Sequence, residues 1–444
     1  MPRFILAAIT GAAIGMGGAA YLSGPLMAQT STDEEHYRQL ELFGDVLDRI
    51  RTGYVEDVDS KELVEAAING MLTSLDPHSS FLSADAAADM RVETRGAFGG
   101  LGIEVTQEEG FIKVVTPMDG TPAFEAGMQP GDFITHVDGV GLLGLTLNDA
   151  VDLMRGPIDS EIVITVVREG TAEPFDVTII RAEIKVPAVR TSLVSDIVVQ
   201  RIATFNEQTL PGVEEGIENT LDEAGGIEGV DGFILDLRNN PGGLLNQAIY
   251  VSDAFLEQGE IVSTRGRGTR DNSRTMARAG DLAQGKPIVV LINGGSASAS
   301  EIVAGALQDH RRAIIVGTKS FGKGSVQTLL NVPGGGAMRL TTARYYTPSG
   351  RSIQALGVAP DIIVEQPPRA PVVEGEDGDE DRPERTERSL RGSLENDSLT
   401  EEQRLQIEAE REQAEKAAEL RDDDYQLAYA IDILKGLAAI ATEE

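Results

Sequence analysis

The stretch Pro287-Ile-Val-Val-Leu-Ile-Asn293-Gly-Gly-Ser296-Ala-Ser298-Ala-Ser-Glu301 decides the fold class of the core. Its apolar run, residues 288–292, predicts a buried β-strand, the small residues after it predict a tight turn, and a helix is expected from residue 299. A serine in such a turn exposes its hydroxyl, and the free N–H groups of the first helical turn can stabilise an oxyanion. The pattern therefore indicates a nucleophile site with Ser298 as its candidate.

A second interpretation of the same residues is structural. Ser298-x-x-Glu301 also fits a capping box, in which the serine oxygen accepts a hydrogen bond at the helix start. Serine is a favoured N-cap residue, so this turn alone leaves both interpretations open.

A lysine further along the chain favours the chemical interpretation. Lys323 stands between two glycines in Phe321-Gly-Lys-Gly-Ser-Val-Gln327, after one predicted strand and before another. A lysine that is desolvated has a lowered pKa and can accept a serine proton as a general base. Gln327 lies four residues on, where its amide is a candidate to orient the amine.

Two other roles of this lysine are a solvated loop cation and a phosphate-binding loop. The spacing Gly-x-x-x-x-Gly-Lys does occur at residues 317–323, but Gly324 replaces the Ser or Thr that a magnesium-dependent phosphate loop requires. We therefore discount phosphate binding.

The region around these motifs, residues 184–366, alternates predicted strands and helices. Strands are expected at 197–202, 232–237, 287–293 and 313–317, and helices at 212–224, 245–256 and 299–309. Such alternation predicts an α/β domain with crossover connections and a site at the carboxyl ends of the strands. The turn Asp236-Leu-Arg-Asn-Asn-Pro-Gly242-Gly243 follows one of these strands, and either glycine is a candidate to donate its N–H to an oxyanion.

The region before the core, residues 96–183, has a different pattern. Short β-type runs at 102–105, 111–115, 132–137, 161–167 and 174–180 are separated by glycine-rich turns, and one helix is expected at 146–154. Residues 34–95 precede it as a helical module, with two amphipathic helices within 34–73 and a loop at 75–82.

The two ends of the chain fall outside these domains. Residues 1–28 read as an export signal with an apolar run from about residue 4 to 23, which is either cleaved after Ala28 or retained as an inner-membrane anchor. Residues 367–424 are Pro-rich and then acidic, which predicts a disordered linker, and residues 425–444 predict a C-terminal helix that docks. We expect a periplasmic or cell-envelope protein that touches the membrane only through its N-terminal segment.

Composition excludes several function classes. The net charge of −34 argues against nucleic-acid binding. The absence of cysteine removes thiol nucleophiles, and the four histidines lack a chelating spacing, so no metal or other cofactor is expected. A serine hydrolase with His310 as base is disfavoured because that residue would lie about 18 Å along the helix that starts after Ser298.

Taken together, the motifs at Ser298–Glu301, Phe321–Gln327, Asp236–Gly243 and residues 75–81 resemble the carboxyl-terminal processing peptidases, also called tail-specific proteases. The resemblance implies a crotonase-like or ClpP-like core, with Ser298 as nucleophile, Lys323 as general base and Gln327 orienting the lysine. It also implies oxyanion donors from Ala299 and from Gly242 or Gly243. The expected enzyme is a serine endopeptidase acting on exported proteins.

Residues 96–183 resemble a PDZ domain inserted before this core, through Phe98-Gly-Gly-Leu101-Gly102-Ile103 and a Gly-Met-Gln-Pro-Gly-Asp turn. PDZ domains bind a peptide C-terminus as an added strand beside a helix. The residues expected to contact an apolar C-terminus are Leu101, Gly102, Ile103, Leu147 and Val151.

Partners follow from the same resemblance. We expect protein or peptide substrates with accessible C-termini, an adaptor protein of the cell envelope such as some relatives use, and a homo-oligomer. The alternative is a catalytically inactive PDZ scaffold, in which Ser298 only caps a helix and Lys323 is solvated.

Overall fold

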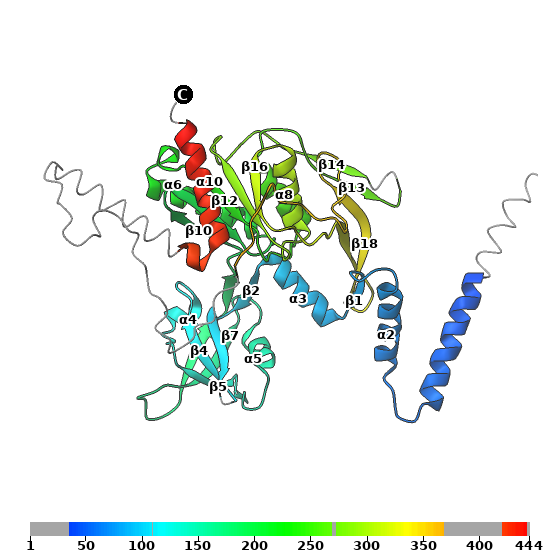
Figure 1. The fold of residues 1–444 in the computed structure, drawn as a ribbon. Helices are drawn as coiled ribbons and strands as arrows, with labels where there is room; N and C mark the ends of the chain where they lie inside the picture. Colours follow the sequence, from blue (N-terminus) through cyan, green and yellow to red (C-terminus); the bar gives the residue numbers. More distant parts are fainter. Residues whose placement is uncertain (1–34, 109, 269–271, 368–419, 442–444) are drawn as a thin grey trace, which may run out of the picture. The chain divides into compact units, whose positions relative to one another are not determined.

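The computed structural model describes residues 35–108, 110–268, 272–367 and 420–441, and the chain divides into two compact units (Figure 1). The predicted export segment, residues 1–28, and most of the predicted acidic linker, residues 367–424, lie outside the described residues. Among the helices that are described, none is both long and apolar enough to cross a bilayer.

The first unit holds the described residues up to 83, together with residues 330–340. It contains a helix over residues 35–53 and α2 (Ser60–Thr73), which confirms the two predicted helices. Asp59 caps α2 by accepting from the backbone N–H groups of Lys61 and Glu62. The expected loop ends in a short strand that was not predicted, β1 (Ser80–Leu82), which pairs antiparallel with residues 337–339 of β18 (Ala337–Tyr346).

The second unit begins with α3 (Ala84–Arg95) and continues into a β-rich region. Its sheet has the order β3-β4-β5-β7-β8, formed by β3 (Ile103–Glu108), β4 (Phe111–Pro117), β5 (Phe133–Val137), β7 (Glu161–Val167) and β8 (Phe175–Ile180). Inward-facing residues alternate along these strands, and Ile112, Ile134 and Ile164 are fully buried. The predicted helix is α5 (Leu147–Met154), whose first turn is held by a capping box between Thr146 and Asp149.

The core of the same unit is a sheet in the order β10-β11-β12-β15-β16-β19. Only β10 (Val189–Val194) runs antiparallel, and the other strands, β11 (Ile197–Ile202), β12 (Gly232–Asp236), β15 (Ile288–Ile292), β16 (Ala313–Gly317) and β19 (Ile362–Ile363), run parallel. Every residue of β12 and β15 is buried, as expected for strands that are covered on both faces. The predicted α/β alternation is therefore confirmed.

Helices cover both faces of this sheet. One hydrophobic cluster joins it to α6 (Thr209–Ala224), α7 (Leu245–Asp253) and α8 (Ala299–Asp309). A second cluster, on the opposite residues of the strands, joins it to α10 (Tyr425–Ala441) through Ala430, Ile431 and Leu434. The red helix α10 in Figure 1 is the predicted C-terminal helix, and it docks on the core.

A second sheet was not predicted, apart from the strand expected after Lys323, which is β17 (Ser325–Asn331). Its other strands are β13 (Glu260–Gly266), β14 (Ser273–Met276), β18 and the short β1, and β18 pairs with β1, β13 and β17. These strands expose polar and charged residues, so their apolar pattern is weak. They matter for function because β17 begins two residues after Lys323 and β18 contains Tyr345.

Candidate active site

The turn between β15 and α8 presents Ser298 in an unusual backbone conformation. Its φ of 56° and ψ of −111° fall where residues other than glycine are rarely found, whereas an ordinary N-cap has an extended backbone. Two hydrogen bonds to the segment after β12 hold the turn in place. The Ser296 hydroxyl donates to the Leu237 carbonyl at 2.8 Å, and the Ser300 hydroxyl donates to the Asn240 carbonyl at 2.9 Å. Strain of this kind persists only where the surroundings fix it, and it clusters at functional sites.

Glu301 explains how the capping and nucleophile interpretations coexist. Its carboxylate accepts from the Ser298 N–H at 2.8 Å, which is the glutamate half of a capping box. The same fully buried carboxylate also accepts from the Ser320 hydroxyl at 2.6 Å and from the N–H groups of Gly322, at 2.7 Å, and Lys323, at 2.9 Å. The carboxylate that caps α8 therefore also holds the loop at residues 320–323 in place.

The backbones of Ser298 and Lys323 meet at one atom. Both N–H groups donate to Glu301 Oε2, and charge-assisted bonds of this kind are stronger than neutral ones. The structure thus brings the two predicted dyad residues together, although they are 25 positions apart in the sequence.

Tyr345 completes the surroundings of the pair. It is almost fully buried, and its hydroxyl donates to the Lys323 carbonyl oxygen. Burial raises the pKa of the Tyr345 phenol well above its usual value, the negative charge of Glu301 raises it further, and a hydrogen bond with the Ser298 side chain acts in the opposite direction. The phenol is therefore neutral at physiological pH and lies against the serine.

Gln327 lies on β17, on the same loop-strand segment as Lys323. Its amide nitrogen donates to the Ser325 hydroxyl at 2.9 Å and to the Thr341 hydroxyl at 3.3 Å. These bonds fix the side chain of Gln327 against β18, and its predicted role in orienting the lysine stays a prediction.

The glycine turn after β12 lies against Ser298. A Cβ atom added to Gly242, whose φ is 103°, would lie 2.8 Å from Ser298 Cβ and 3.0 Å from the Ala299 nitrogen. Only glycine allows this approach. The Gly242 N–H already donates to Asn240 Oδ1 at 2.9 Å, whereas the described residues offer no acceptor to the N–H of Gly243. Ala299 is the first residue of α8, so its N–H has no acceptor within the helix.

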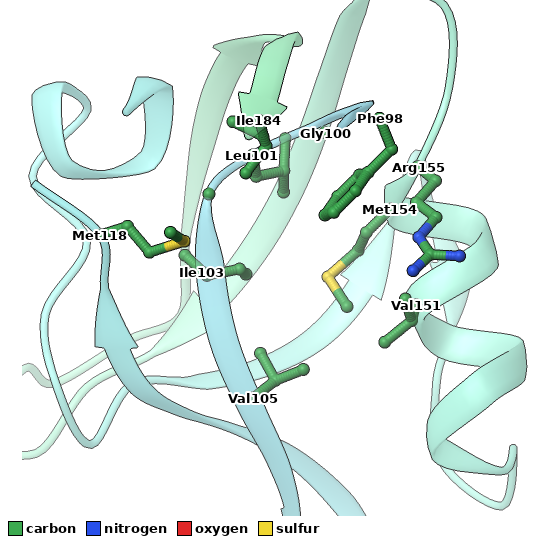
Figure 2. Close-up of a pocket in the computed structure, with 11 residues that line it drawn as sticks. Phe98, Gly100, Leu101, Ile103, Val105, Met118, Val151, Met154, Arg155 and Ile184 are labelled. Carbon is green, nitrogen blue, oxygen red and sulfur yellow. The ribbon is translucent and has the colours of Figure 1, made fainter. Parts of the chain in front are cut away.

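A small pocket lies between β3 and α5 in the β-rich region (Figure 2). Its volume is about 70 Å³, and its walls are apolar except for Arg155, whose guanidinium lies 4.7 Å from the centre of the Phe98 ring. Of the predicted peptide contacts, Leu101, Gly102, Ile103 and Val151 line it. Leu147 does not line it, although it packs against the same hydrophobic core as Ile103 and Val151.

His310 does not lie near Ser298 along the helix. It caps the far end of α8, and its Nε2 is 2.7 Å from the Glu260 carbonyl oxygen. The histidine thus joins α8 to β13, which agrees with the prediction that it is not the base.

Three family models match the chain. Peptidase family S41 matches residues 196–364, the PDZ domain matches residues 113–168, and the activating protease CtpB N-terminal domain matches residues 18–86. The carboxy-terminal-processing protease of Bartonella bacilliformis is 56% identical over 352 residues, which cover 78% of this chain and 81% of that protein. This chain belongs to the carboxy-terminal-processing proteases.

Two further relatives are less similar to this chain. The carboxyl-terminal-processing protease of Synechocystis is 37% identical over 328 residues, which cover 72% of this chain and 75% of that protein. The solved photosystem II D1 C-terminal processing protease is 29% identical, with 73% of this chain and 92% of that chain covered and a TM-score of 0.42.

Membership of the family confirms the predicted class of enzyme and fold. The chain is a serine protease, built from an N-terminal helical region, a PDZ domain and an S41 peptidase core. Sequence reasoning did not assign roles to the buried Glu301 and Tyr345 or to Arg155 in the pocket. Glu301 stood in a recognised motif, but its partners lie about twenty residues away in the sequence, at Ser320, Gly322 and Lys323.

Proposed function

We propose that this protease cleaves exported proteins with a Ser298-Lys323 dyad, after its PDZ domain has bound their apolar C-termini. The observation that carries the proposal is the shared carboxylate of Glu301, which holds the backbones of both residues while Ser298 adopts a strained conformation. A helix cap alone would need neither the lysine loop nor the positive φ.

Acylation begins when Ser298 Oγ attacks the scissile carbonyl carbon and its proton passes to the neutral amine of Lys323. The carbonyl π electrons move to the oxygen and give a tetrahedral oxyanion. When the C–N bond breaks, the lysine ammonium returns the proton to the leaving amine. Water then attacks the acyl-enzyme with the lysine again as base, which releases the second product and restores the serine.

The oxyanion donors that we propose are the N–H groups of Ala299 and Gly243. Both lack an acceptor among the described residues, and the neighbouring Gly242 backbone lies against Ser298. The Gly242 N–H is the weaker candidate because it is already bonded to Asn240. Preorganised donors of this type contribute about 10²–10³ each to the catalytic rate.

Substrate selection is assigned to the pocket between β3 and α5. Strand β3 lies at the edge of its sheet, so a peptide can add as a further strand there. The N–H groups of Leu101 and Gly102 have no acceptor among the described residues, and they lie at the end of β3, where a terminal carboxylate would sit. The apolar walls favour an apolar terminal side chain, and Arg155 adds a positive charge.

Export, an N-terminal anchor and a homo-oligomer remain proposals that rest on residues 1–28 and on the family. Mass spectrometry of the protein from fractionated cells would give its mature N-terminus. A chain that begins near residue 29 in the periplasmic fraction supports cleavage, an intact chain in the membrane fraction supports an anchor, and an intact chain in the cytosol contradicts export.

The test of the proposed function is cleavage of a loosely folded protein with an apolar C-terminus by the full-length enzyme, purified in detergent. Ser298→Ala and Lys323→Ala should each abolish cleavage and keep binding to the C-terminal peptide. Lys319→Ala is the matched control, because this exposed lysine belongs to the same loop. Persistent cleavage by Ser298→Ala would contradict the proposal, and an enzyme that neither cleaves nor labels with a fluorophosphonate would favour the scaffold alternative.

A further inference from the structure

The turn that carries the proposed oxyanion glycines begins at Arg238, whose side chain is partly buried. Arg238 donates from Nε and Nη2 to the carboxylate of Asp236 at 2.9 and 2.7 Å, and its own N–H donates to Asp236 Oδ1 at 3.0 Å. The remaining N–H groups of the guanidinium bond to another residue. They donate to both oxygens of Asp424, from Nη1 at 2.7 Å and from Nη2 at 2.6 Å.

Asp424 belongs to the C-terminal helix, not to the catalytic core. It is the residue before α10, and its Oδ1 also accepts from the Leu427 N–H at 3.0 Å, so it acts as the N-cap of that helix. Gln426 supports the same position, because its side chain accepts from Arg238 and donates to the Val364 carbonyl oxygen at 2.7 Å. The helix itself is fixed by its apolar cluster on the sheet.

Asn239 follows Arg238 and connects the clamp formed by Asp236, Arg238 and Asp424 to the turn that presents Ser298. Asn239 has a φ of 53°, and its N–H donates to Asn293 Oδ1 at 2.8 Å while its own Oδ1 accepts from Asn293 Nδ2 at 2.9 Å. Asn293 is the first residue after β15. Its N–H donates to the Ser296 hydroxyl oxygen at 3.0 Å, which ties it to the turn. Hydrogen bonds, together with the peptide bond between Arg238 and Asn239, thus connect Asp424 to the turn that presents Ser298.

Electrostatics keep this clamp charged. Burial raises the pKa of Asp424, but the hydrogen bonds from Arg238 and Leu427 and the positive charges of Arg238 and Arg201 together hold it below its ordinary value. Arg201 also bonds to Asp236 at 2.8 Å, so two arginines and two aspartates alternate in one network. A bidentate arginine–carboxylate pair fixes direction as well as distance.

We propose that Asp424 is a positioning residue for catalysis: through Arg238 it fixes the turn at residues 238–243, so the C-terminal helix completes the oxyanion site. This inference rests on the proposed function, because it assigns the Ala299 and Gly243 N–H groups to the oxyanion. If the clamp is lost, the turn gains freedom and the Gly243 donor leaves its place opposite Ala299. Misplacement of a donor by about 1 Å can cost two orders of magnitude in rate.

The test compares Asp424→Asn with Asp432→Asn in the full-length enzyme. Asparagine is as good an N-cap as aspartate, so the first variant keeps the helix cap and removes the charged clamp. Asp432 is the matched control, because it lies on α10 and forms an exposed 2.8 Å ion pair with Arg421. We expect kcat of Asp424→Asn to fall about tenfold or more, with KM and peptide affinity unchanged, and Asp432→Asn to match the wild type.

A second readout separates positioning from simple stability. Phosphonylation of Ser298 by a fluorophosphonate uses the same oxyanion donors, so its rate constant should fall in parallel with kcat. Asp424→Glu, which keeps the charge, should recover part of both rates. Lower thermal stability of the variants with an unchanged kcat and labelling rate would overturn the proposal and leave Asp424 a structural anchor.

The outcomes also distinguish this inference from the proposed function. If Ser298→Ala retains activity, the dyad proposal fails regardless of Asp424. If cleavage depends on Ser298 and folded Asp424→Asn cleaves as fast as the wild type, only the positioning role fails.

Discussion

Ser298, the proposed nucleophile, has a backbone conformation that is strained for any residue with a side chain. Its φ of 56° and ψ of −111° suit glycine, and the bonds of Glu301, Ser296 and Ser300 hold it there. Strained residues of this type cost about 1–3 kcal/mol each, which the surrounding structure must offset. The conformation of Ser298 is therefore held at the expense of stability.

This strain predicts an inverse effect on stability and activity. Ser298→Gly should abolish cleavage and raise the free energy of unfolding by about 1 kcal/mol relative to Ser298→Ala. Glycine adopts this conformation without strain, and we expect this gain to exceed the loss from its greater unfolded-state entropy. Chemical denaturation of the two inactive variants measures the difference. A glycine variant that is less stable than the alanine variant would contradict strain at this position.

Tyr345 predicts a pH dependence. The raised pKa of its buried phenol means that the folded protein favours the neutral form, so its contribution to stability is fully present below about pH 10 and is lost as the pH rises above that value. The free energy of unfolding should therefore fall less steeply between about pH 9 and 11 in Tyr345→Phe than in the wild type. Tyr346→Phe, the neighbouring substitution, is the control, and equal slopes in both variants would argue against the shift.

At the scale of elements, the proposed positioning of the turn at residues 238–243 depends on the packing of α10. Leu434 is fully buried against β12, β15 and β16, whereas Leu437, three residues on, is 37% exposed. Leu434→Ala should lower the free energy of unfolding by about 2–5 kcal/mol, while Leu437→Ala should cost less than about 1 kcal/mol. Equal costs in denaturant titrations would show that α10 does not dock through this face.

The elements differ in how far the sequence predicts them. The strand at 288–292 is a continuous apolar run and the strand at 232–236 has an apolar centre, Phe-Ile-Leu, and both are followed by glycine turns, so their existence and their part in the site follow from local pattern. Strands β13, β14 and β18 carry exposed polar residues and pair with distant segments, so no local signal marks them. The dyad candidates follow from short motifs, but Asp424 lies 186 residues after Arg238, and their contact follows only from tertiary packing.

At the scale of the molecule, capture and cleavage are assigned to different domains. A negative charge in the PDZ pocket should therefore weaken substrate binding and leave the rate of the chemical step unchanged. Val151→Asp should raise KM for a substrate with an apolar C-terminus about tenfold and leave its kcat unchanged, since the new carboxylate offsets the charge of Arg155 and repels a terminal carboxylate.

Val140→Asp is the control for this change, because Val140 is half exposed in the same domain and does not line the pocket. Steady-state kinetics with and without the apolar tail on the substrate separate the two effects. A Val151→Asp enzyme with wild-type KM would remove the pocket from substrate capture.

The central claim is that Lys323 is the base for Ser298, and the rate of Ser298 phosphonylation as a function of pH tests it most directly. The account predicts that the wild type labels at Ser298 with a rate that rises as one group loses its proton. Lys323→Ala should lack that ionisation and label at least about a hundredfold more slowly, with its fold intact. An unchanged rate and pH profile in Lys323→Ala would contradict the dyad.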